Sequence, residues 1–226
     1  MAGTALIQVL GAIAYGEHKA YDKATERARS AIDAEERRMW RTIAAEELRH
    51  HKGFVRRLVA LGADPDRAMA PYRASLDRFH SMAPEPDEIR AAVLDLLGEG
   101  IASDLLSWLR RVADPDTAAF VDTVIADEVG HEGRAAAEVR RLMADAPDGR
   151  RRGSAAARQM VLRMASSGGR TGVPFTAFVR LGRAHELVGA LAGGYTRRLR
   201  MLGIEPWHTL GRFDVLGVLG AAQPAA

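Results

Sequence analysis

Two Glu-x-x-His motifs, Glu47 to His50 and Glu128 to His131, constrain the fold more than any other part of the sequence. Residues three apart in a helix lie on the same face, so in each motif a carboxylate and an imidazole can converge on one metal ion. One such motif alone carries little weight, because 14 Glu and 7 His in 226 residues produce about 0.4 of them by chance. Two such motifs indicate a metal site only if other potential ligands in the sequence fit the same site.

Two further glutamates precede the motifs at nearly equal distances. Glu17 lies 30 residues before Glu47, and Glu99 lies 29 residues before Glu128. All four glutamates fall within predicted helices, on the apolar stripe rather than the polar face, as when Glu17 follows Ile13 by four residues. The sequence therefore predicts one set of metal ligands facing a common core, which consists of Glu17, Glu47, His50, Glu99, Glu128 and His131.

Four carboxylates on core-facing positions need positive charge beside them, because burying an unpaired charge costs several kcal/mol. Two divalent cations would supply about four positive charges and leave both imidazoles neutral as ligands. One Glu from each of two helices, with Glu-x-x-His from each of two others, is the ligand set of di-iron and di-manganese carboxylate proteins. Oxygen and nitrogen ligands in a chain without cysteine suit iron or manganese better than zinc. We therefore expect two Fe ions, with Mn as the alternative, and place the four glutamates in the catalytic centre.

The composition favours an all-α fold. Hydrophobic residues make up 47% of the chain and aromatic residues only 6%, and no sustained alternation of β-branched residues suggests a strand. Short turns join the first two and the next two predicted helices, which gives a four-helix bundle with one long crossover between helices two and three. The crossover, residues 62–85, contains three prolines and has room for a short helix near residues 72–80. The six predicted helices cover approximately residues 4–30, 33–61, 86–112, 115–144, 154–166 and 174–202.

The charge divides the chain into an expected bundle domain, residues 1–146, and a basic helical extension, residues 147–226. The first part carries 20 Lys and Arg against 25 acids, whereas the second carries 12 Arg against 4 acids. A solvated Arg-rich helix face explains this excess most simply, and a surface for a phosphate-bearing partner such as RNA is the alternative. The extension should pack on the bundle, with a loosely ordered tail from about residue 206.

Small side chains surround Glu99, namely Gly98, Gly100, Ala102 and Ser103. Each glycine in a helix interior costs up to about 1 kcal/mol relative to alanine, so their presence needs a reason. Close helix packing explains it, and so does room for oxygen or a substrate beside the metals.

The chain resembles the ferritin-like di-iron superfamily over about residues 4–144, where all six ligand positions of that pattern are present. Within it, the tRNA hydroxylases that act on isopentenylated adenosine are similar in two stretches, Ala-Glu-Glu-Leu-Arg-His at 45–50 and Ala-Asp-Glu-x-x-His at 126–131. The resemblance implies that Glu46 and Asp127 accept the spare N–H of a ligand histidine, exposed helix acids being the alternative. After Glu99 the run Gly-Ile-Ala-Ser-Asp departs from the more polar run of those enzymes, which bears on the substrate rather than the metal site.

The function expected from this resemblance is that of an oxidase or hydroxylase that activates molecular oxygen at a di-iron site. Its substrate would be an isopentenyl-type group on tRNA bound through the basic extension, and the bundle could form a homodimer. An external electron donor is needed, because the chain carries no flavin or iron–sulfur motif. The alternatives are a ferroxidase or an erythrin-type peroxide-scavenging or iron-handling protein, and a helical RNA- or partner-binding protein with a structural metal site.

The apolar stretch at residues 5–14 resembles the core of a signal peptide. It has no preceding Lys or Arg and no small-residue cleavage site before Glu17, so we interpret it as the buried face of the first helix. No segment approaches the length of a membrane span. The sequence therefore predicts a cytoplasmic protein without a membrane partner.

Overall fold

The computed structural model describes residues 2–80, 85–170, 175–182 and 184–206. Over these residues the chain forms eight helices and no strand, which confirms the predicted all-α class. Every helix in this part of the chain is too short or too polar to serve as a membrane span. The helices are α1 (Ala2–Ser30), α2 (Ala34–Ala60), α3 (Pro65–His80), α4 (Glu88–Val112), α5 (Pro115–Asp145), α6 (Gly149–Arg170), α7 (Phe175–Leu181) and α8 (Ala184–Met201).

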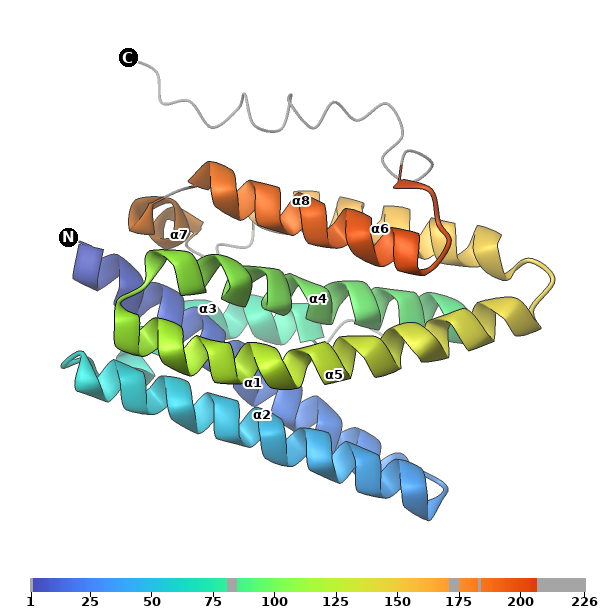
Figure 1. Cartoon of the computed structure of the whole chain (residues 1–226), viewed down its shortest axis with the longest axis horizontal. Helices are drawn as coiled ribbons and strands as arrows, with labels where there is room; N and C mark the ends of the chain where they lie inside the picture. The colour runs from blue at the N-terminus through green and yellow to red at the C-terminus, as the bar shows by residue number, and fades with distance from the viewer. Residues whose placement is uncertain (1, 81–84, 171–174, 183, 207–226) are drawn as a thin grey trace.

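Two helical hairpins form the bundle (Figure 1). α1 packs along α2, α4 packs along α5, and α2 meets α5 where the hairpins join. α3 lies in the connection between the hairpins and packs against α1. This arrangement confirms the predicted helical bundle with a long crossover between its second and third helices.

Aspartates at the N-caps fix where three bundle helices begin. The side chain of Asp33 accepts hydrogen bonds from two backbone N–H groups in the first turn of α2, at 2.9 and 2.8 Å. Asp87 and Asp114 cap α4 and α5 in the same way, at 3.1 and 3.0 Å, and Pro115 follows the second of them. Each cap contributes about 1 kcal/mol to its helix. The caps also fix the residues at which α2 and α5 begin, and both Glu-x-x-His motifs lie within these two helices.

Two apolar clusters lie along the bundle with a polar layer between them. The first cluster joins α1, α2, α4 and α5 at one end and includes the fully buried Phe54 and Trp108. The second joins α4 and α5 to α6 and α8 and includes Val139. On α5, the Glu128–His131 motif falls between Val124 of the first cluster and Ala136 of the second. The predicted site therefore lies in the polar layer.

The crossover contains more helix than the sequence predicted. α3 spans Pro65–His80 with Pro71 inside it, whereas only a short helix near residues 72–80 was expected among the prolines. Ala68 and Tyr72 of α3 are buried in the first apolar cluster. α3 approaches α1 at Gly11, where a Cβ would overlap the backbone carbonyl of Ala68. Burial against α1 thus outweighs the hydrogen bond that Pro71 removes from the helix.

The helices after α5 also differ from their predicted bounds. α6 begins at Gly149, five residues early, and continues to Arg170. The single helix predicted over residues 174–202 is divided into α7 and α8 near Gly182, whose φ of +107° favours glycine. α6 and α8 pack on α4, and α7 packs on α1. The domain division at residue 146 stays a prediction, and the tail after residue 206 lies outside the described residues.

Candidate metal centre

Three helices bring buried carboxylates and a histidine together in the polar layer. Glu17 comes from α1, Glu47 and His50 come from α2, and Glu128 comes from α5. One ligand atom of each lies within 4.8 Å of the corresponding atoms of the others. Glu17 and Glu47 are each 6% exposed and His50 is 1% exposed, so the cluster is buried in the bundle. This grouping arises because each motif occupies the apolar face of its helix.

The two histidines face the same pair of carboxylates. His50 Nδ1 lies 3.6 Å from Glu47 and 3.7 Å from Glu128, and it lies 3.4 Å from Glu17. His131 Nδ1 lies 3.3 Å from Glu47 and 3.6 Å from Glu128. The two oxygens of Glu47 are divided between the histidines, Oε2 near His50 and Oε1 near His131. Glu47 and Glu128 are therefore placed between two imidazoles.

The outer nitrogens of both histidines bond to acids on the opposite helix. His50 of α2 donates Nε2–H to Asp127 of α5 at 2.9 Å, and His131 of α5 donates Nε2–H to Glu46 of α2 at 2.7 Å. These bonds leave the Nδ1 atom of each ring directed at the cluster. The structure thus gives Glu46 and Asp127 the contacts expected of them, although their role beside a metal stays a prediction.

His131 adjoins the cluster through Glu47 and Glu128, whereas the structure does not bring Glu99 to these residues in the same way. The carboxylate of Glu99 accepts a hydrogen bond from Lys23 Nζ at 2.9 Å, and its side chain is 47% exposed. It still lines a small pocket together with Glu128 and His131. The other five predicted ligands converge, and the role of Glu99 as a ligand stays a prediction.

Burial and hydrogen bonding together set the protonation of the cluster. Burial raises the pKa of Glu17 to about 8 and also raises the pKa of Glu128. Burial would raise the pKa of Glu47 too, but the neighbouring imidazoles of His131 and His50 lower it to about 2. Burial opposes charge on the imidazoles, yet the carboxylates that lie beside them raise the pKa of His50 to about 10 and that of His131 to about 11. Protons on the histidines therefore supply the positive charge that these carboxylates require.

The residues present fit a pair of cations. Nδ1 of His50 is buried without a hydrogen-bond partner, although it faces the carboxylates of Glu17 and Glu47. An unsatisfied buried polar atom costs about 1–3 kcal/mol, which coordination would remove. Carboxylate and imidazole donors without a thiolate suit iron or manganese. The residues that could hold the metals are Glu17, Glu47, His50, Glu128 and His131.

Sequence reasoning missed a buried ionic network beside this cluster. Arg198 of α8 is 1% exposed and pairs with Asp104 of α4, which is 4% exposed, and with Glu132 of α5 at 3.2 Å. Two glycines make room for it, since a Cβ on Gly100 would overlap the Arg198 guanidinium and one on Gly194 would overlap Asp104. Close packing, rather than room for a substrate, therefore explains Gly100. The signal in the sequence was the four-residue spacing from Gly100 to Asp104 and from Gly194 to Arg198.

Comparison with known proteins agrees with this architecture. A family model for the ferritin-like domain of actinomycetes matches residues 3–173, which include all the converging ligands and the crossover. No curated protein matches the chain. The match does not distinguish the tRNA hydroxylases from other members of the superfamily, so that closer similarity stays a prediction. Because the match covers most of the chain, this protein belongs to the ferritin-like domain family of actinomycetes.

Proposed function

We propose that this protein is a non-haem di-iron oxidoreductase that uses molecular oxygen to oxidise or hydroxylate an organic substrate. Its main support is the reciprocal pair of histidines, whose Nδ1 atoms face Glu47 and Glu128 while their Nε2 atoms bond across the helices. When bound at such a site, a pair of iron ions supplies the redox chemistry that activates oxygen.

The residues of the chain would hold, orient and shield that metal pair. Glu47 and Glu128, which lie near both imidazoles, and Glu17, which lies near His50, would hold the metal ions together with the two histidines. The apolar clusters on either side limit access of bulk water to the polar layer. A small pocket lined by Leu96, Gly100 and Ser103 reaches Glu128 and His131 and has room for about one water-sized molecule next to the site.

An isopentenyl-type group on tRNA is the substrate that we propose. Its support comes from the similarity of the two motif stretches to tRNA hydroxylases and from exposed arginines in the basic extension, such as Arg150, Arg180 and Arg200. Two other arginines of the extension are not available to bind phosphate, because Arg152 pairs with Asp87 at 2.6 Å and Arg198 is buried. The phosphate-binding surface would therefore be limited to the outer faces of α6, α7 and α8.

The test is the metal content and optical spectrum of the purified protein after anaerobic loading with ferrous iron and exposure to air. We expect about two irons per chain and an oxo-bridge absorption near the ultraviolet edge, both of which Glu128→Ala should lose. Glu138→Ala is the matched control, since Glu138 lies on the exposed face of the same helix and pairs with Arg141. Absence of stoichiometric iron in the unaltered protein would reject the proposal. Iron oxidation that continues with excess ferrous ion, without any organic substrate, would instead indicate a ferroxidase.

A further inference from the structure

The exposed face of α2 carries a row of five cations with no acid among them. Its charged side chains recur three, four or eight residues apart, so they lie on one side of the helix over about 27 Å. Small side chains, Thr42 and Ala45, separate them. The two acids of this stretch turn away from the row, because Glu46 bonds to His131 and Glu47 is buried in the site. We call this surface the α2 basic face, and it consists of Arg38, Arg41, Arg49, Lys52 and Arg56.

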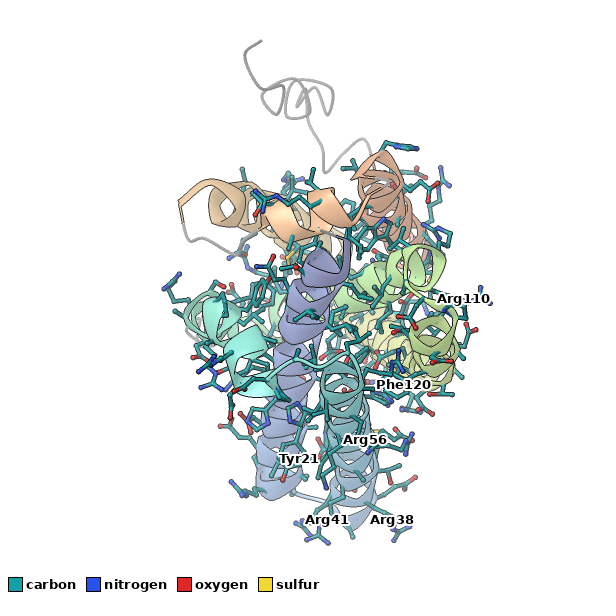
Figure 2. The ribbon with its side chains drawn as sticks, turned by 90° about the vertical axis from the view of Figure 1, so that its left-hand side faces the viewer. Tyr21, Arg38, Arg41, Arg56, Arg110 and Phe120 are labelled. Carbon is teal, nitrogen blue, oxygen red and sulfur yellow. The ribbon has the colours of Figure 1, made fainter. Side chains whose placement is uncertain are left out.

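The α2 basic face has almost no compensating charge. Among the described residues only Arg49 of the five has an ion-pair partner, which is Asp127 at 2.6 Å. Arg38 and Arg41 extend from α2 into solvent, away from the other helices (Figure 2). Like charges three and four residues apart on a helix destabilise it by about 0.2–0.5 kcal/mol per pair. The row therefore opposes helix stability in the isolated chain, and a negatively charged partner would relieve that repulsion.

Arg49 connects this surface to the site through two hydrogen bonds. The same oxygen of Asp127, Oδ2, accepts from Arg49 Nη2 at 2.6 Å and from His50 Nε2 at 2.9 Å. Arg49 is 56% exposed, whereas the His50 side chain is 2% exposed. The centre of the α2 basic face is thus two hydrogen bonds from a predicted metal ligand.

The pocket beside the site opens elsewhere. The residues that line it come from α4 and α5 and include Glu99, whose side chain is half-exposed, but none comes from α2. A substrate that reaches this pocket therefore leaves the α2 basic face free. The face also carries no aromatic side chain on which a base could stack, which single-stranded nucleic acids generally use. These observations favour a protein partner over a nucleic acid.

We propose that the α2 basic face is the docking surface for an acidic one-electron carrier protein. This inference rests on the proposed function, which requires outside electrons, and the chain has no cysteine with which to hold an iron–sulfur cluster of its own. The carrier would be oxidised by one electron per encounter, and a ferric ion held at the site would be reduced to ferrous. Asp127 and His50 would lie between the docking surface and that ion. No covalent bond forms or breaks at the docking surface. Complementary charge would steer the carrier to an exposed patch that is hydrogen-bonded to the site.

The test compares a charge-reversal variant of this face with a matched control. The variant is Arg41→Glu/Lys52→Glu/Arg56→Glu, and the control is Arg29→Glu/Arg67→Glu/Arg140→Glu, which alters exposed arginines outside both the α2 basic face and the basic extension by the same net charge. The probes are a plant-type [2Fe–2S] ferredoxin and a 20-nucleotide single-stranded RNA. Binding to the manganese-loaded protein is measured at low and high salt, and the rate at which reduced ferredoxin reduces the ferric protein is measured by stopped flow.

We expect ferredoxin to bind and to reduce the ferric protein, and both the affinity and the rate to fall by about 10- to 100-fold in the variant but not in the control. High salt should weaken binding in the same way. Absence of ferredoxin binding, or an equal loss in the control, would overturn the proposal. RNA binding that only the variant loses, without ferredoxin binding, would assign the face to a nucleic acid. Binding does not depend on iron, so failure of the α2 basic face is distinguishable from failure to form the di-iron site, which the iron content reports.

Discussion

The Nε2–H of His50 in α2 donates to the carboxylate of Asp127 in α5, at 2.9 Å. The converse bond runs from His131 in α5 to Glu46 in α2, at 2.7 Å. Each predicted ligand histidine is therefore oriented by the helix that carries the other one. This exchange couples the packing of α2 against α5 to the direction in which both Nδ1 atoms point.

Replacing either outer acid by its amide should weaken metal binding without unfolding the protein. In Asp127→Asn or Glu46→Gln the side chain keeps its size, but a neutral amide holds the imidazole less firmly and lowers its basicity as a ligand. We expect the affinity for manganese to fall by roughly 10- to 100-fold in each variant, measured by competition with a chelator. Asp116→Asn, at a position where the side chain is 84% exposed, is the control. Equal affinities in all four proteins would contradict the role of the two acids.

Metal binding should release protons and should weaken as the pH falls. The pKa values of His50, about 10, of His131, about 11, and of Glu17, about 8, all lie above neutral pH. Near pH 7 the metal must therefore displace roughly two to three protons per chain, and its affinity should rise between about pH 6 and 9. Calorimetry in buffers of different ionisation enthalpy measures the released protons. A binding heat that does not depend on the buffer would show that the cluster is already deprotonated.

The converging ligands were predictable because helical periodicity places residues on a face. Glu17, Glu47 and Glu128 each lie on the apolar stripe of a helix, so their grouping follows once the helices pack together. Periodicity does not choose the rotamer of a long side chain. Glu99 was predicted to face the metal site, but its carboxylate accepts a hydrogen bond from Lys23, which is 76 residues away in the sequence. The sequence pattern contains nothing that decides between a lysine and a metal ion for that glutamate.

The buried ionic network could not be predicted for a different reason. Arg198 and Asp104 are 94 residues apart, and their pairing depends on how α8 lies across α4. Arginine in a helix is usually exposed, so a basic extension predicts a solvated face. Only the two glycines that accommodate the pair indicated that α4 and α8 cross closely, and glycine in a helix has several explanations.

The length of α3 was not predicted for the same reason, since it depends on burial of α3 against α1.

Metal loading should draw Glu99 away from Lys23. Two cations at the site outcompete one ammonium group, and Lys23 keeps a second partner in Asp95, at 3.1 Å. We therefore expect Glu99→Ala to lower the bound metal from about two ions to about one per chain. Asp95→Ala removes the other partner of the same lysine and should leave the content unchanged. Metal content is measured after removal of loosely bound ions, and two ions in Glu99→Ala would exclude Glu99 as a required ligand.

Two glycines of α1 should respond to alanine with opposite signs. A Cβ on Gly11 would overlap the carbonyl of Ala68, and because that neighbour is backbone, α3 must move away. A Cβ on Gly16 meets nothing within 4 Å. Gly11→Ala should therefore destabilise the protein, whereas Gly16→Ala should stabilise it by up to about 1 kcal/mol through helix propensity. Urea unfolding of both variants measures this. Equal effects would mean that α3 does not contact α1 as closely as the structure shows.

Loss of Arg198 should destabilise the protein through the acid that it leaves behind. Arg198→Leu deprives Asp104 of its buried partner, and burial already raises the pKa of that carboxyl despite the arginine. Breaking a buried pair by removing one partner costs about 3–5 kcal/mol, whereas replacing both partners by apolar residues is often neutral. We therefore expect Arg198→Leu to unfold at much lower urea than the unaltered protein, and Asp104→Leu/Arg198→Leu to regain most of the loss. If the double variant were no more stable than the single one, the arginine would act through packing on Gly100 and not through its charge.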